Sequence, residues 1–156
     1  MAYWLMKSEP DVFGYDDLVA AKREGWDGIR NYQARIFLRA MRKGDKAIFY
    51  HSNATPPGVA GVAKIVGEAE PDPTQFDPTC KYFDSGSNPD EPRWDLVTVA
   101  PVKKLRFIPL DELRTMPELA ECRLLAKGNR LSVIPLTDDE FEAIVAAGNA
   151  RGRSAR

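Results

Sequence analysis

The sequence predicts an α+β domain in which a small barrel of strands is surrounded by short helices. The stretches that favour strands are of uneven length, and short helical stretches interrupt them at irregular intervals. This combination is typical of a partly closed barrel. A doubly wound sheet is not expected, because the strands are not separated by regular crossover helices.

The first third of the chain predicts two strands and two helices. An apolar strand over residues 2–6 is followed by a helix over residues 15–24. Asn31 is expected to cap a second helix over residues 32–42, because its side chain can accept a hydrogen bond from the first turn. The next strand spans residues 45–51.

The rest of the chain predicts three more strands. Two long strands, residues 59–70 and 94–107, flank a segment rich in Pro, Asp, Ser and Gly at residues 71–92, which we call the excursion. A loop this long in a small domain is usually functional or mobile. The later strand is expected to bend at Pro101, and a short strand spans residues 131–134 before Pro135.

Two helices are expected near the C-terminus. Residues 110–116 favour a short helix. Thr137 and Glu140 have the spacing of a capping box, so the last helix should begin there and end at Gly148. We therefore expect one domain over residues 1–148. Residues 149–156, with Arg151, Arg153 and Arg156, should form a basic, disordered tail.

Composition narrows the class of protein. The chain has 156 residues, 44% hydrophobic and 29% charged, which suits one globular domain with a core. No apolar run approaches the roughly 20 residues of a membrane helix, and the polar N-terminus favours a cytoplasmic location. With one histidine and two distant cysteines, neither a metal site nor a cofactor is expected, and both thiols should be free.

Charge is unevenly distributed although the net charge is only −1. Arg35, Arg39 and Arg42 share one face of the helix at residues 32–42, which makes a basic stripe. Such a stripe can bind phosphates or can simply be a solvated face. Acidic residues dominate the excursion and its flanks, so we expect it to lie away from the basic side or to act as a rim.

Two strands end in polar clusters. Lys7, Ser8 and Glu9 follow the first strand, and His51, Ser52 and Asn53 follow the strand at residues 45–51. If the strands are neighbours, the clusters can meet at one end of the barrel and line a pocket. The alternative is two ordinary polar turns. Because neighbouring residues on a strand point to opposite faces, His51 and Ser52 cannot bond to each other while the strand persists.

Trp26 lies in a loop between Gly25 and Gly28. A tryptophan in a loop is a better candidate to contact a ligand face than one inside a strand. The alternative is that Trp26 plugs the end of the barrel.

Four spaced motifs carry a specific resemblance. They are Trp4-Leu5-Met6-Lys7-Ser8-Glu9-Pro10, Trp26-Asp27-Gly28-Ile29-Arg30-Asn31-Tyr32-Gln33-Ala34-Arg35, Phe49-Tyr50-His51-Ser52-Asn53 and Leu131-Ser132-Val133-Ile134-Pro135-Leu136. In this order they closely resemble the EVE domain family, over nearly the whole chain. The resemblance implies a PUA-like pseudo-barrel that binds DNA or RNA without catalysis and reads a modified base, with modified cytosine favoured.

The resemblance also nominates site residues. The implied base pocket consists of Ser8, Trp26, Asn31, Tyr32, His51 and Ser52. The basic residues expected to contact phosphates are Arg30, Arg35, Arg39 and Arg42. An alternative function is a small hydrolase of the amidohydrolase type acting on modified nucleosides, with Lys7 as base and Glu9 as acid, or with His51 as base.

Overall fold

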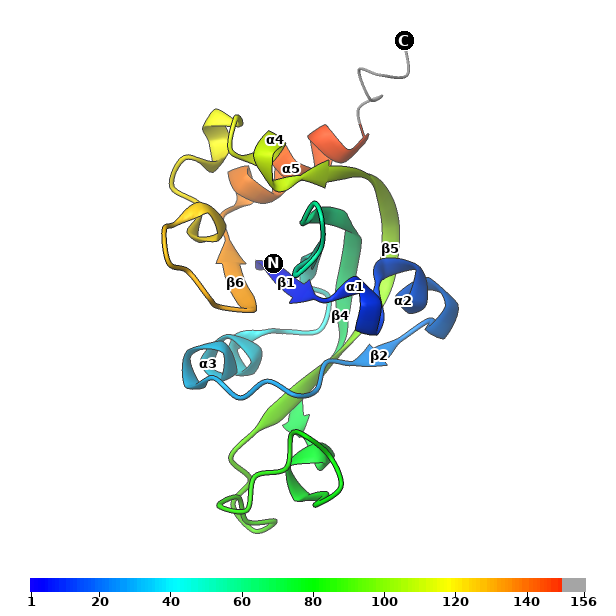
Figure 1. Ribbon diagram of the computed structural model, residues 1–156, viewed down its shortest axis with the longest axis vertical. Helices are drawn as coiled ribbons and strands as arrows, with labels where there is room; N and C mark the ends of the chain where they lie inside the picture. The colour runs from blue at the N-terminus through cyan, green and yellow to red at the C-terminus, as the bar shows by residue number, and fades with distance from the viewer. Residues whose placement is uncertain (150–156) are drawn as a thin grey trace.

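Six strands form one mixed sheet in the computed structural model, which describes residues 1–149 (Figure 1). The order across the sheet is β2-β5-β4-β3-β1-β6. The strands are β1 (Tyr3–Ser8), β2 (Glu24–Gly25), β3 (Lys46–His51), β4 (Gly58–Pro71), β5 (Asp95–Pro109) and β6 (Val133–Leu136). The α-helices are α1 (Pro10–Phe13), α2 (Tyr15–Ala21), α3 (Tyr32–Ala40), α4 (Leu110–Leu113) and α5 (Asp138–Asn149). Short 3-10 helices are η1 (Pro73–Phe76), η2 (Pro117–Leu119) and η3 (Arg123–Leu125). The predicted α+β class is confirmed.

β1, the first strand of the chain, lies between β3 and the edge strand β6. It runs parallel to β3, with Ser8 opposite His51, and antiparallel to β6. The remaining neighbours, β3–β4, β4–β5 and β2–β5, are antiparallel. The first strand and the strand that ends at His51 are therefore neighbours.

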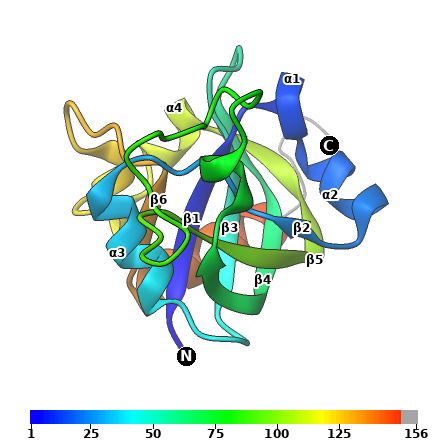
Figure 2. The ribbon, with the colours of Figure 1, turned by 90° about the horizontal axis from the view of Figure 1, so that it is seen from below.

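β4 and β5 are long and curl around the molecule (Figures 1 and 2). The pairing between them shifts register at four places, one of them between Val62 and Ala63, and Ala63 lies opposite Pro101. Such irregularities increase twist and bend a strand pair, which is how a sheet closes toward a barrel. The bend expected at Pro101 is consistent with this irregular pairing.

The two faces of the sheet bury separate hydrophobic clusters. Along β1, Trp4 and Met6 belong to one cluster, whereas Leu5 between them belongs to the other, as the two-residue period of a strand requires. The first cluster is completed by α2 and α3 through residues such as Leu18 and Leu38. The second is completed from the C-terminal half by Leu113, Leu119, Phe141 and Ile144.

Both predicted helix caps are confirmed. The Asn31 side chain accepts a hydrogen bond from the Ala34 amide at 3.0 Å, at the start of α3. At the start of α5, the Thr137 hydroxyl accepts from the Glu140 amide at 3.1 Å, and the Glu140 carboxylate accepts from the Thr137 amide at 2.9 Å. This reciprocal pair is the predicted capping box.

Several predicted boundaries were wrong, among them the ends of α3 at Ala40 and of α4 at Leu113. α2 ends at Ala21, because Lys22 adopts a left-handed conformation with φ 70°, and β2 begins at Glu24. β6 continues through Pro135, which is tolerated because β6 is an edge strand. The last helix does not stop at Gly148 but includes Asn149.

Gly148 has a packing role instead of a terminating one. A Cβ atom at this position would lie 2.7 Å from the side chain of Leu105 on β5, so only glycine lets α5 approach the sheet this closely. The rest of the predicted tail, residues 150–156, lies outside the described residues. Within residues 1–149, Cys80 and Cys122 are both free, and no helix is long and apolar enough to cross a membrane.

Candidate functional site

The polar ends of β1 and β3 meet. The Ser52 amide donates to the Ser8 carbonyl oxygen at 2.9 Å, and the Asn53 side chain donates to the Glu9 carboxylate at 3.1 Å. The Ser8 hydroxyl donates to the Phe13 carbonyl oxygen at 2.6 Å, which ties the short helix α1 to the same place. The parallel pairing of β1 and β3 brings their ends to the same edge, which fulfils the condition that the sequence analysis set for the clusters to meet.

A pocket of about 420 Å³ opens beside these strand ends. This volume lies in the range of roughly 300–1,000 Å³ that is usual for small-molecule sites. Its walls come from β1, α1, the segment from β2 to Ile29, the turn after β3, the excursion and the segment before β6. The lining residues are Lys7, Ser8, Glu9, Val12, Phe13, Glu24, Gly25, Trp26, Asp27, Gly28, Ile29, Ser52, Asn53, Lys81, Tyr82, Arg130 and Ser132.

Three of the six predicted pocket residues lie in this pocket: Ser8, Trp26 and Ser52. Trp26 is only 8% exposed and packs edge-on against Phe49, with ring centroids 5.4 Å apart. Its amide donates to the Val97 carbonyl oxygen at 2.7 Å. Trp26 therefore both contributes to the pocket wall and belongs to the core, and its contact with a ligand stays a prediction.

The other three predicted pocket residues do not line this pocket. Asn31 caps α3, and Tyr32 is exposed on α3, where its ring packs on Trp94 with centroids 4.8 Å apart. His51 faces a second cavity of about 380 Å³ together with Tyr15 and Phe107. The alternation of β3 accounts for this, since Ser52 and His51 face different ways.

His51 has a structural partner. Its Nε2 atom accepts a hydrogen bond from the Tyr15 amide at 3.1 Å, at the start of α2. An acceptor nitrogen must be unprotonated, so this bond requires the neutral imidazole. Burial lowers the pKa of His51, with a smaller lowering from Lys104 that nearby Asp16 opposes.

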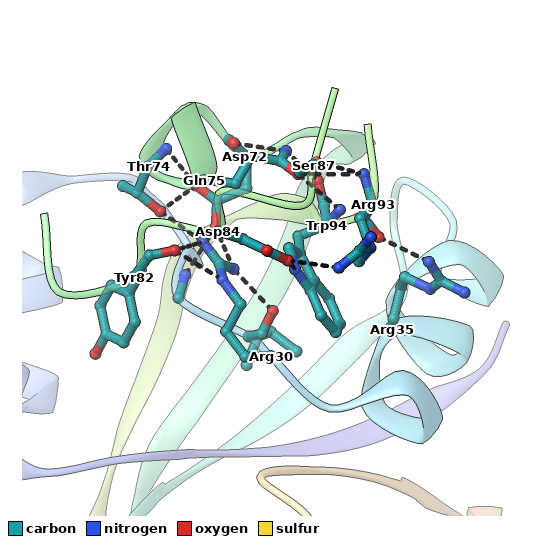
Figure 3. A network of polar contacts seen from close by, with 12 residues as sticks. Arg30, Arg35, Asp72, Thr74, Gln75, Tyr82, Asp84, Ser87, Arg93 and Trp94 are labelled. Atoms are coloured by element: carbon teal, nitrogen blue, oxygen red, sulfur yellow. Dashed lines mark hydrogen bonds and ion pairs between the residues drawn. The ribbon is translucent and has the colours of Figure 1, made fainter. Parts of the chain in front are cut away.

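Arg30, in the segment that follows Trp26, forms an ion pair and hydrogen bonds with the excursion (Figure 3). Its guanidinium forms an ion pair with the fully buried Asp72 at 3.1 Å and donates to the Thr74 hydroxyl at 3.0 Å. It also donates twice to the Tyr82 carbonyl oxygen. Asp72 accepts a further bond from the Gly28 amide at 2.9 Å. These contacts outweigh burial, which by itself would raise the pKa of Asp72, and they hold that pKa below its ordinary value.

Residues that follow the excursion, Arg93 and Asp95, contact the basic helix α3. Arg35 donates to the Arg93 carbonyl oxygen at 2.7 Å, and Arg39 forms an ion pair with Asp95. The buried Gln75 side chain of the excursion donates to the carbonyl oxygens of Asp72 and Trp94 and accepts a hydrogen bond from the Arg93 amide. Lys81 and Tyr82 of the excursion line the pocket, which is consistent with the expected rim, whereas its position relative to the basic side stays a prediction.

The four arginines predicted to contact phosphates thus have different surroundings. Arg30, Arg35 and Arg39 each use guanidinium donors on internal partners. Arg42 is exposed, and it donates to the carbonyl oxygens of Arg39 and Met41 at the end of α3. Phosphate contacts by this set remain a prediction, and Arg39 and Arg42 are its two exposed members.

Sequence comparison identifies the family. The sequence profile of the EVE domain matches residues 2–147. This chain belongs to the EVE domain family. Its sheet is accordingly the PUA-like fold that the resemblance implied.

Relatives of this EVE domain are well matched over their length. Mouse thymocyte nuclear protein 1 is 45% identical over 162 residues, which are 92% of this chain and 72% of the relative. A crystal structure from Pseudomonas putida shares 47% identity and superposes with a TM-score of 0.90, covering 93% of this chain and 98% of the other. Human THYN1 protein, solved in complex with 5-methylcytosine-containing DNA, shares 42% identity with a TM-score of 0.91, covering 97% and 100%.

The pocket of this EVE domain also contains residues that sequence reasoning missed. Tyr82 is the most informative: a Cβ atom on Gly28, whose φ is +80°, would lie 2.7 Å from the Tyr82 ring. The ring therefore lies directly on the Gly28 backbone, close to Trp26 in sequence. An aromatic residue within a mostly polar excursion was an available signal, but only the fold shows what it packs on.

Positively and negatively charged side chains both line the pocket. Lys7, on β1, has a pKa lowered by burial. Burial raises the pKa of Glu24, as does repulsion by Asp27. Burial likewise raises the pKa of Asp27, with a further contribution from Asp72 that Arg30 opposes. Among the residues described, no group of His, Cys, Asp and Glu has the arrangement needed to hold a metal ion.

Proposed function

We propose that this EVE domain binds DNA that carries 5-methylcytosine and accepts the modified base in the pocket at the ends of β1 and β3. The observation that carries the proposal is the meeting of hydroxyl groups (Ser8, Ser52) and aromatic rings (Trp26, Tyr82) in one pocket of about 420 Å³. The complex of human THYN1 protein with 5-methylcytosine-containing DNA supports the choice of ligand.

The pocket chemistry matches the cytosine ring. Its flat faces suit the aromatic rings, and stacking is worth about 1–3 kcal/mol per base. The exocyclic amine of cytosine can donate a hydrogen bond to the carboxylate of Glu24 or Asp27. Its ring nitrogen and carbonyl oxygen can accept hydrogen bonds from Lys7 and Ser52. The apolar side chains of the lining, Val12, Phe13 and Ile29, suit a methyl group.

A base can enter such a pocket only after it has left the base stack. Extruding it from a duplex costs a few kcal/mol, whereas a single strand avoids that cost. We therefore expect tighter binding to a single strand than to a duplex of the same sequence. Tighter binding to the equivalent RNA would instead assign RNA as the ligand.

Fluorescence anisotropy with labelled oligonucleotides tests the proposal. The wild-type protein should bind a strand with one 5-methylcytosine more tightly than the same strand with cytosine. Tyr82→Ala should weaken binding about tenfold or more, through lost stacking. Phe83→Ala is the matched control, because Phe83 is the next residue, is exposed and does not line the pocket. Equal affinity of the wild-type protein for both strands would overturn the proposal.

Lys7 favours a second candidate function, hydrolysis of a modified nucleoside. A lysine whose pKa is lowered by burial in a pocket is a suitable general base. Incubation with 5-methylcytidine and its deoxynucleoside, followed by mass spectrometry, distinguishes the two. A product that Lys7→Met abolishes would assign catalysis, whereas unchanged nucleoside would leave binding as the function.

A further inference from the structure

Lys81 and Arg130 are two cations at the pocket. Both side chains are exposed and line the pocket, although they come from separate segments, the excursion and the stretch that precedes β6. In the described part of the chain, neither has a carboxylate within ion-pair distance. This distinguishes them from Arg30 and Arg39, whose guanidinium groups are paired with Asp72 and Asp95.

The fold places these two cations on different walls. Arg130 is two residues before Ser132, whose carbonyl oxygen accepts a bond from the Lys7 amide at 2.8 Å, so it belongs to the β1–β6 side of the pocket. Lys81 adjoins Tyr82, whose ring lies on Gly28, so it belongs to the side that contains Trp26. The Lys81 ammonium lies 5.0 Å from the centre of the Tyr82 ring, which keeps it beside that aromatic face.

The carboxylates of the pocket limit where a phosphate can lie. Glu9, Glu24 and Asp27 line the same space, and they repel a phosphate group. A neutral base is not repelled, and its amine can donate to a carboxylate. A nucleotide is therefore favoured with its base in the pocket and its phosphates outside, next to the two exposed cations.

We propose that Lys81 and Arg130 bind the backbone phosphates on the two sides of the nucleotide whose base enters the pocket. This inference rests on the proposed function and adds the path of the backbone across the pocket mouth. It replaces the stripe on α3 as the main phosphate contact. Phosphate contacts position a nucleic acid without reading its sequence.

The salt dependence of binding tests the inference. Anisotropy titrations with the single strand carrying 5-methylcytosine are made over a series of NaCl concentrations, for the wild-type protein and Lys81→Ala/Arg130→Ala. Each lost phosphate contact should reduce the slope of log K against log salt by about 0.7 for a single strand. The double variant should therefore lose about 1.4 in slope, with weaker binding at low salt.

A control and a second readout make the result decisive. Lys103→Ala/Arg114→Ala removes the same charge from exposed positions that do not line the pocket, and its slope should equal that of the wild-type protein. The ratio of affinities for methylated and unmodified strands should not change in the Lys81/Arg130 variant. The inference is overturned if the Lys81/Arg130 variant keeps the wild-type salt slope, or if the control variant loses as much slope as it does. This holds even when the preference for 5-methylcytosine persists. A reduced slope in a protein without that preference overturns the proposed function and supports the inference.

Discussion

Two N–H groups of Arg30 donate to one oxygen atom, the backbone carbonyl of Tyr82, from Nε at 3.0 Å and Nη2 at 2.8 Å. The same guanidinium reaches Asp72 and Thr74 at the start of the excursion. Arg30 therefore joins the two ends of the stretch from Asp72 to Tyr82, which positions the Tyr82 ring at the pocket.

Arg30→Ala should destabilise the protein and loosen this stretch. Asp72 would remain fully buried without its cationic partner, and breaking such a pair typically costs about 3–5 kcal/mol. Urea denaturation should show this loss, and amide hydrogen exchange should rise in the excursion. Lys104→Ala is the control, because its ion pair with Asp16 is exposed and such pairs contribute about 0–1 kcal/mol. Equal losses in both variants would remove the special role of Arg30.

Gly28→Ala should displace the Tyr82 ring. The new Cβ atom would meet the ring at 2.7 Å, and the positive φ adds a strain of about 1 kcal/mol. Affinity for the strand with 5-methylcytosine should fall. Gly44→Ala has the same kind of backbone strain, with φ +98°, but nothing within 4 Å of the new atom. It should lose stability without losing affinity, and a parallel loss of affinity in both variants would contradict a role for Tyr82.

Stability should fall as pH drops through the range where His51 titrates. Burial makes the pKa of His51 lower in the folded state than its unfolded value of about 6.5, so the unfolded chain binds the extra proton first. The contribution of His51 is complete above about pH 6.5 and declines below it. His51→Gln keeps a side-chain acceptor for the Tyr15 amide but does not titrate.

Urea denaturation of both proteins from neutral pH to pH 5 measures this contribution. Subtracting the His51→Gln curve removes the opposite trend from Glu24 and Asp27, whose raised pKa values favour the folded state at lower pH. Parallel curves for the two proteins would show that His51 does not titrate with folding.

Asp45→Asn should weaken the attachment of the N-terminus. The Asp45 carboxylate accepts bonds from the Ala2 amide, the Trp4 indole and the Arg42 amide, and these together outweigh burial and lower its pKa. Hydrogen bonds to a charged group contribute about 1.5–3 kcal/mol, so a loss of that order is expected.

The pH dependence provides a check on Asp45. Its contribution is present above the unfolded pKa of about 3.9 and is lost as pH falls through the lower folded value, a loss that Asp45→Asn should not show. Asp16→Asn, at an exposed carboxylate, is the control and should change the free energy of unfolding by less than about 1 kcal/mol.

Local sequence signals predicted the parts of the fold that depend on local chemistry. The caps at Asn31 and Thr137 were correct because capping involves residues three apart. The meeting of Ser8 with Ser52 was predicted only conditionally, since it required β1 and β3 to be neighbours. Gly148 was misread as a helix stop because its contact with Leu105 is distant in sequence.

The pocket illustrates the same limit. Tyr82 and Arg130 reach it through tertiary packing, so neither periodicity nor a local motif could place them there. The basic stripe on α3 was correct as a pattern, but the pattern does not reveal that Arg39 faces Asp95. Side chains that share a helix face can still have different partners, which only the packed structure identifies.

The position of β1 between β3 and β6 affects how the chain folds as it is synthesised. One edge of β1 can pair as soon as β3 has left the ribosome, but the other edge waits for Leu136, which pairs with Tyr3. Until then the nascent chain exposes an unpaired edge with Trp4, Leu5 and Met6, a liability for aggregation. A contact this distant in sequence also slows folding. A fragment that ends before β6 should therefore be retained by chaperones or aggregate, although it contains most of the pocket.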